Sequence, residues 1–133
     1  MVYLSEAEAT ELARLLLEDY NVEKIVDVGD GSSTKALSIG GAKHVHAVDI
    51  NEDALKEVRG YPHVIAVKTD ASSMKFPYKA LNMSGLGLYA PDVAVQVIRN
   101  AISQNLTLIA LSPVLKVQEL CLMMQDIPII YMG

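Results

Sequence analysis

A glycine-containing turn after the first β-branched run is the clearest candidate for ligand chemistry in this sequence. The chain there reads Asp27-Val28-Gly29-Asp30-Gly31. The two glycines permit a tight turn without side chains, so the backbone can approach a ligand closely. A helix that starts just behind the turn adds free amide groups at the same place. The turn is therefore predicted to hold a ligand against backbone N–H groups.

Acidic residues at the ends of the next two predicted strands indicate the class of ligand. Asp49 stands twenty residues after Gly29 and ends the second strand, and Asp70 follows the third. Parallel strands bring their carboxyl ends to one edge of a sheet, so Asp27, Asp49 and Asp70 are expected on one rim. A carboxylate at position 49 can accept hydrogen bonds from the hydroxyls of a ribose. The alternative is that the glycines only turn the chain and the acids are solvated strand ends.

Strand and helix patterns alternate along the chain and must position this rim. We expect an α/β fold in a single Rossmann-like domain over residues 1–133, with a mostly parallel sheet of about six strands and helices on both faces, a three-layer sandwich. The expected helices are 6–19, 33–39, 52–58, 92–104 and 116–124, and the expected strands are 24–28, 44–49, 64–68, 85–89, 106–111 and 127–132.

Composition narrows the classes of partner. The formal net charge of −5 argues against a surface that coats nucleic acid. The single cysteine, Cys121, has no partner for a disulfide, and the acidic first residues do not form a secretory signal. Polar residues interrupt the longest apolar stretch, 93–115, so no membrane span is expected. These observations favour a soluble, cytoplasmic protein.

The residues around the turn distinguish between two adenosine-containing cofactors. The dinucleotide fingerprint calls for a third glycine where this chain has Thr34. Carboxylates at Asp27 and Asp30 disfavour a pyrophosphate, whereas they suit the zwitterionic amino acid and sulfonium of S-adenosylmethionine. The charges therefore favour S-adenosylmethionine over a nicotinamide dinucleotide, which remains an alternative.

The stretch Ile25–Ala71 resembles the class I S-adenosylmethionine-dependent methyltransferases, and more loosely a group of shortened, uncharacterised archaeal members. The match consists of the acid two residues before a Gly-x-Gly loop, with Ser33 at the family's third glycine. The resemblance implies that Asp49 binds the ribose, that Ile50 packs on the adenine, and that Asp70 and the backbone of Ala71 lie near the adenine amino group. The implied cofactor-binding residues are Asp27, Gly29, Asp30, Gly31, Asp49, Ile50, Asp70 and Ala71.

The sequence departs from the family where the methyl acceptor would bind. Family members that methylate amino groups carry Asn/Asp-Pro-Pro-aromatic after the fourth strand, and this chain has Tyr89-Ala90-Pro91-Asp92 there. The family's sheet usually ends in an antiparallel hairpin, and here a sixth strand is expected instead. No catalytic residue is identified; Asp30, Tyr89 and Asp92 are the nearest candidates. A methyltransferase-like cofactor binder is expected, and a non-catalytic binding or regulatory module is the alternative.

Two further features concern metal binding and self-association. His44 and His46 share one face of a predicted strand, but no third ligand is evident, so no metal site is predicted. The chain is small and apolar, and an exposed sheet edge is expected, so self-association as a homodimer is predicted. The second copy would complete the wall of the substrate pocket that the short chain lacks.

Overall fold

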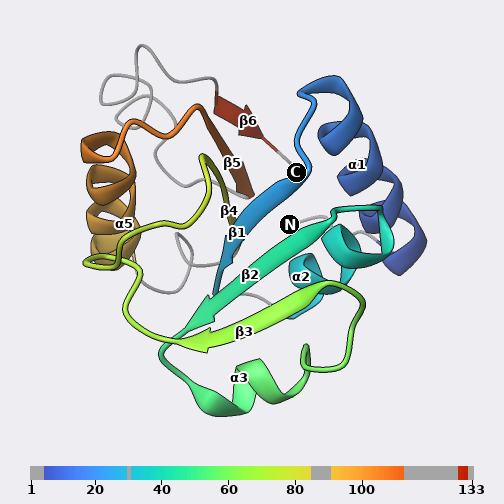
Figure 1. The fold of residues 1–133 in the computed structure, drawn as a ribbon, viewed down its shortest axis with the longest axis horizontal. Coiled ribbons are helices and arrows are strands. Elements are labelled where there is room, and N and C mark those ends of the chain that lie inside the picture. Colours follow the sequence, from blue (N-terminus) through green and yellow to red (C-terminus); the bar gives the residue numbers. More distant parts are fainter. Residues whose placement is uncertain (1–4, 30, 85–90, 113–128, 132–133) are drawn as a thin grey trace.

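Within the described residues, six parallel strands form the sheet that carries the glycine turn; Figure 1 shows how they are arranged. The structure, a computed structural model, describes residues 5–29, 31–84, 91–112 and 129–131. The strand order is β3-β2-β1-β4-β5-β6. From β1 the chain first adds strands on one side, β2 and then β3, and afterwards on the other side, beginning with β4. Ligands of such sheets bind at this switch point, beyond the carboxyl ends of the strands. The strands are β1 (Lys24–Val28), β2 (His44–Asp49), β3 (Val64–Lys68), β4 (Ala80–Ser84), β5 (Leu108–Ser112) and β6 (Ile129–Tyr131).

Helices cover both faces of the sheet, which confirms the predicted three layers. Helix α5 (Pro91–Ser103) lies on one face, and α1 (Glu6–Asp19), α2 (Gly31–Ile39) and α3 (Glu52–Lys56) lie on the other (Figure 1). No helix within the described residues is long and apolar enough to cross a membrane.

Alternating side chains of β1 divide the core between these two layers. Val26 and Val28 pack with Val97 and Ile98 of α5, whereas Ile25 packs on the opposite face. All of these side chains are buried, as expected for a parallel strand covered on both sides. Leu37 of α2 and Leu17 of α1 join Ile25 in its cluster.

Helix α1 begins as the sequence predicts. The Ser5 hydroxyl accepts a hydrogen bond from the Glu8 amide (3.1 Å), and the Glu8 carboxylate accepts one from the Ser5 amide (3.1 Å). This capping box satisfies amides that the first helical turn leaves without partners.

Gly40, directly after α2, brings α1 and α2 into backbone contact. A Cβ at this position would lie 2.7 Å from the Ala36 carbonyl oxygen, 3.1 Å from the Arg14 nitrogen and 3.1 Å from the Thr10 carbonyl oxygen. A glycine is therefore required for α2 to end against α1.

The fourth strand lies earlier than predicted. It runs from Ala80 to Ser84, and the predicted range 85–89 lies outside the described residues. The strand at 80–84 was not predicted, because Asn82 interrupts its apolar pattern; that side chain is 1% exposed and hydrogen-bonded inside the sheet. The predicted helix 116–124 also lies outside the described residues, while 129–131 of the predicted last strand forms β6.

The connection from β3 to β4 contains no helix, and two amide side chains of α5 and the turn after it fix its path. Asn100 Nδ2 donates to the Ala71 carbonyl (3.0 Å) and to the Met74 carbonyl (2.8 Å). Gln104 Nε2 donates to the same Met74 carbonyl (2.8 Å), and its Oε1 accepts from the Phe76 amide (2.8 Å). These side chains satisfy backbone groups of the connection that the internal hydrogen bonds of a crossover helix would otherwise satisfy.

Replacing Gln104 with methionine should destabilise the fold. The substitution keeps side-chain length but leaves the Phe76 amide without its acceptor, which should cost about 1–3 kcal/mol of unfolding free energy in urea titrations. Gln96→Met is the control, because Gln96 is an exposed residue of α5. Equal losses in the two variants would contradict this role.

Candidate functional site

The glycine turn has the conformation that its sequence requires. Gly29 adopts φ 85°, which residues with side chains rarely tolerate. Its amide donates to the Val48 carbonyl at 3.1 Å, which ties the start of the turn to β2. Helix α2 begins at Gly31, so its first amides face the same edge of the sheet.

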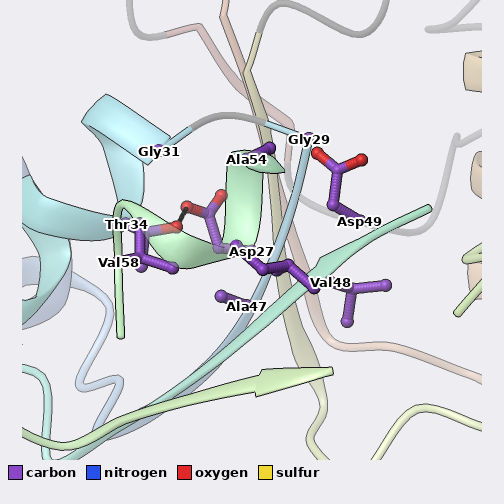
Figure 2. A pocket seen from close by; sticks show the side chains of 10 residues that line it. Asp27, Gly29, Gly31, Thr34, Ala47, Val48, Asp49, Ala54 and Val58 are labelled. Atoms are coloured by element: carbon purple, nitrogen blue, oxygen red, sulfur yellow. Dashed lines mark hydrogen bonds between the residues drawn. The ribbon is translucent and has the colours of Figure 1, made fainter. Parts of the chain in front are cut away.

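Asp27 lies beneath the turn and not on its surface. The residue is 1% exposed and lies opposite Asn82 of β4 in the sheet register. Its Oδ2 accepts hydrogen bonds from the Ser33 and Thr34 hydroxyls, both at 2.7 Å, and its Oδ1 accepts one from Asn82 Nδ2 at 2.7 Å. Figure 2 shows the bond to Thr34, with the carboxylate directed toward α2. Asp27 therefore ties β1 to α2 and β4.

This network explains two departures from glycine-rich fingerprints. Ser33 and Thr34 stand where those fingerprints have a third glycine, and both hydroxyls point down to Asp27. The sequence alone marks Ser33 and Thr34 only as substitutions, and Asn82 was not among the predicted site residues. The available signal was Asn82 between apolar residues in the run 80–83, in a strand adjacent to the acid.

Asp49 lies at the rim beside the turn, as predicted. Figure 2 shows its carboxylate next to Gly29 at the end of β2. The Oδ1 atom accepts a hydrogen bond from the Asn51 amide at 2.9 Å, and Oδ2 makes none with the described residues. The side chain is thereby fixed in orientation while one oxygen can still accept a bond. Ile50, the next residue, is 71% exposed.

Asp70 stands at the corresponding place after β3. Its Oδ1 accepts hydrogen bonds from the Ser72 amide (2.9 Å) and the Ser72 hydroxyl (2.7 Å). The hydroxyl and amide of Ser72 lower the pKa of this carboxyl below its usual value. Ala71 is buried against the α5 layer, and its carbonyl accepts the bond from Asn100, so only its amide could face a ligand.

A small pocket connects the turn with β2 and α3. Its volume of about 10 Å³ is close to what one water needs, so a cofactor would lie over the rim and not inside this pocket. The lining residues are Asp27, Gly29, Gly31, Thr34, Ala47, Val48, Asp49, Ala54, Leu55 and Val58 (Figure 2).

The other candidates contribute little to this rim. Asp30 and Tyr89 lie outside the described residues, and Asp92 is exposed in the first turn of α5. His44 and His46 lie near the Tyr78 ring (6.4 and 6.1 Å between centroids), away from the turn. No group of three or more potential metal ligands occurs in the part of the chain that the structure describes.

Removing the Thr34 hydroxyl should weaken the anchoring of the turn. Thr34→Val preserves shape at a side chain that is 2% exposed but deletes a hydrogen bond to a carboxylate. The unfolding free energy should fall by about 1.5–3 kcal/mol in denaturant titrations. Thr10→Val in α1 is the matched control, and a loss of the same size there would contradict the assignment.

The Ser72 hydroxyl should control the acidity of Asp70. In Ser72→Ala the Asp70 pKa should rise toward its ordinary value, measured by a carbon-detected NMR titration of the carboxyl. A lowered pKa in the folded state means that these bonds stabilise the fold above the unfolded pKa and lose that effect as the pH falls through the folded pKa. Ser73→Ala should leave the Asp70 titration unchanged.

Comparisons with known proteins show the fold but no family. No family model matches the sequence, and no curated protein matches it significantly. Among solved structures, the magnesium protoporphyrin IX methyltransferase ChlM from Synechocystis PCC 6803, with bound SAH, matches at TM-score 0.59 and 18% identity, over 74% of this chain and 51% of that one. The N-methyltransferase NodS from Bradyrhizobium japonicum WM9 matches at TM-score 0.55 and 18% identity, over 74% of this chain and 60% of that one.

A third match comes from a different class of protein. An alcohol dehydrogenase zinc-binding domain protein from Burkholderia ambifaria matches at TM-score 0.56 and 17% identity, over 93% of this chain and 38% of that one. The chain therefore covers less than two thirds of the length of each of these three structures. At such low identities the comparisons establish one conclusion, that the chain has a Rossmann-like α/β fold similar to that of methyltransferases.

Proposed function

We propose that this chain binds S-adenosylmethionine along the rim formed by β1, β2 and β3, as a methyltransferase-like protein. The Gly29–Gly31 turn would face the methionine part, Asp49 would accept the ribose hydroxyls, and Asp70 would lie near the adenine amino group. The observation that carries the proposal is the Asp49 carboxylate, held beside the turn with one oxygen available.

The exposure of Ile50 supports the place of the adenine. A large aliphatic side chain that is 71% exposed directly after the ribose-binding acid offers an apolar surface for a flat base. Stacking of adenine on this surface would remove apolar area from water, which is favourable. The similar methyltransferase ChlM has been solved with bound SAH and with bound SAM, which supports this class of ligand.

The reaction proposed for the bound cofactor is transfer of its methyl group to an acceptor that the sequence does not identify. Such a transfer depends mainly on placing a nucleophile in line with the sulfonium, so positioning can dominate the catalysis. The protein's own contribution in the described region is a fixed rim: Gly29 is tied to β2, and Asp27 is tied to α2 and β4. A binding module without catalysis would use the same rim.

A nicotinamide dinucleotide is the second candidate ligand. The strand order is the one that dinucleotide-binding folds use, and the likeness to the dehydrogenase covers most of this chain. Against it, Thr34 occupies the place of the third glycine, and its hydroxyl is directed to the buried acid below the turn.

Calorimetric titration should separate these ligands. S-adenosylmethionine and S-adenosylhomocysteine should bind, and NAD should not. Asp49→Ala should weaken S-adenosylmethionine binding by roughly 10- to 100-fold, the effect of losing hydrogen bonds to a charged group.

Asp53→Ala provides the matched control, because Asp53 is an exposed acid on the nearby helix α3. The affinity of the Asp53→Ala variant for S-adenosylmethionine should equal that of the unaltered chain. Binding of NAD alone, or equal weakening by both variants, would overturn the proposal. Formation of S-adenosylhomocysteine with an added acceptor would then distinguish an enzyme from a binding module.

A further inference from the structure

A second hollow lies at the opposite edge of the sheet from the glycine turn. It is a groove of about 520 Å³, within the range of about 300–1,000 Å³ typical of small-molecule sites. We call it the basal groove, because it runs along the amino ends of β1 and β4 and the segment before β5. Its lining residues are Asn21, Val22, Glu23, Lys24, Tyr78, Lys79, Ala80 and Thr107.

The charge of the basal groove is positive although the chain as a whole carries −5. Among the described lining residues the only carboxylate is that of Glu23, which forms an ion pair with Lys43 at 3.0 Å. Lys79 donates from Nζ to the Gln104 backbone carbonyl at 3.0 Å, an uncharged partner. Neither Lys24 nor Lys79 pairs with a carboxylate among the described residues. Two ammonium groups therefore line the groove without a counter-charge from that part of the chain.

The Tyr78 ring lines the groove beside the Lys24 ammonium group. Lys24 Nζ lies 5.9 Å from the ring centroid, and the imidazole of His46 meets the ring edge-on at 6.1 Å. Burial lowers the pKa of His46, which disfavours a charge on this imidazole. Tyr78 also packs against the core cluster of α5, which limits its freedom.

We propose that the basal groove is a second binding site, for a small organic anion. A phosphate or carboxylate group would lie between the Lys24 and Lys79 ammonium groups, and the apolar body of the ligand would lie against Val22, Tyr78 and Ala80. Opposite charge and desolvation in a concave site make such pairs stronger than on an open surface. The site is separate from the cofactor rim, since none of its residues belongs to that rim.

NMR titration of the ¹⁵N-labelled full chain tests this site with matched probes. Phenyl phosphate and benzoate carry the two anionic groups, and benzyl alcohol is the uncharged analogue. Phenyl phosphate or benzoate should shift the amides of Lys24, Lys79 and Ala80 at millimolar concentrations, and the stronger of the two identifies the anionic group. Added salt should weaken the effect. In the double variant Lys24→Gln with Lys79→Gln, affinity should fall at least about tenfold, as expected when charge-assisted bonds are lost.

The variant Lys75→Gln is the control, because Lys75 is an exposed lysine outside the groove. Equal shifts with benzyl alcohol, no shifts with either anion, or unchanged affinity in the double variant would overturn the proposal. Binding of an oligonucleotide at the same amides, with no small-anion shifts, would overturn it as well. A separate titration with S-adenosylmethionine, followed at Gly29, Gly31 and Asp49, reports on the cofactor rim, so failure of one site does not imply failure of the other.

Discussion

The buried carboxylate of Asp27 is the constraint around which the carboxyl edge of the sheet is arranged. A charged group with 1% exposure is costly unless hydrogen bonds replace the water it has lost. Ser33 and Thr34 of α2 and Asn82 of β4 supply such bonds from two other elements. The position of the turn at Gly29 therefore depends on a strand that arrives more than fifty residues later in the chain. A substitution in β4 can thus alter the turn without touching it.

Much of the first half of the fold could be predicted because its signals are local. The capping box at Ser5, the glycine after β1 and the acid at the end of β2 each mark a boundary through a mechanism that acts over a few residues. Parallel pairing then follows from the alternation of strands and helices. The placement of Asp49 beside the turn was predicted for the same reason, although the chemical roles of the rim residues remain predictions.

Strand β4 and the path that leads to it were not predicted, because their determinants are tertiary. A buried asparagine in β4 looks like a break in an apolar run until its partner on β1 is known. The path between β3 and β4 is fixed by Asn100 and Gln104, which follow it by about thirty residues and carry no local signal for this role. The sequence also does not predict that the Ser33 and Thr34 hydroxyls point toward Asp27, because that direction depends on the packing of α2 over β1. The periodicity of apolar residues identifies helices and strands. Long-range polar contacts such as these decide where some of them begin.

The backbone contact at Gly40 couples α1 to the ligand rim, although α1 itself lies away from that rim. Helix α2 has nine residues and is about 13 Å long, with the glycine turn at one end and Gly40 at the other. Since Gly40 rests on the Thr10 and Arg14 backbone, α2 cannot slide along its axis unless α1 moves with it. Helix α1 therefore holds α2, and with it the turn, in position. A ligand that immobilises the turn should also slow amide hydrogen exchange in α1.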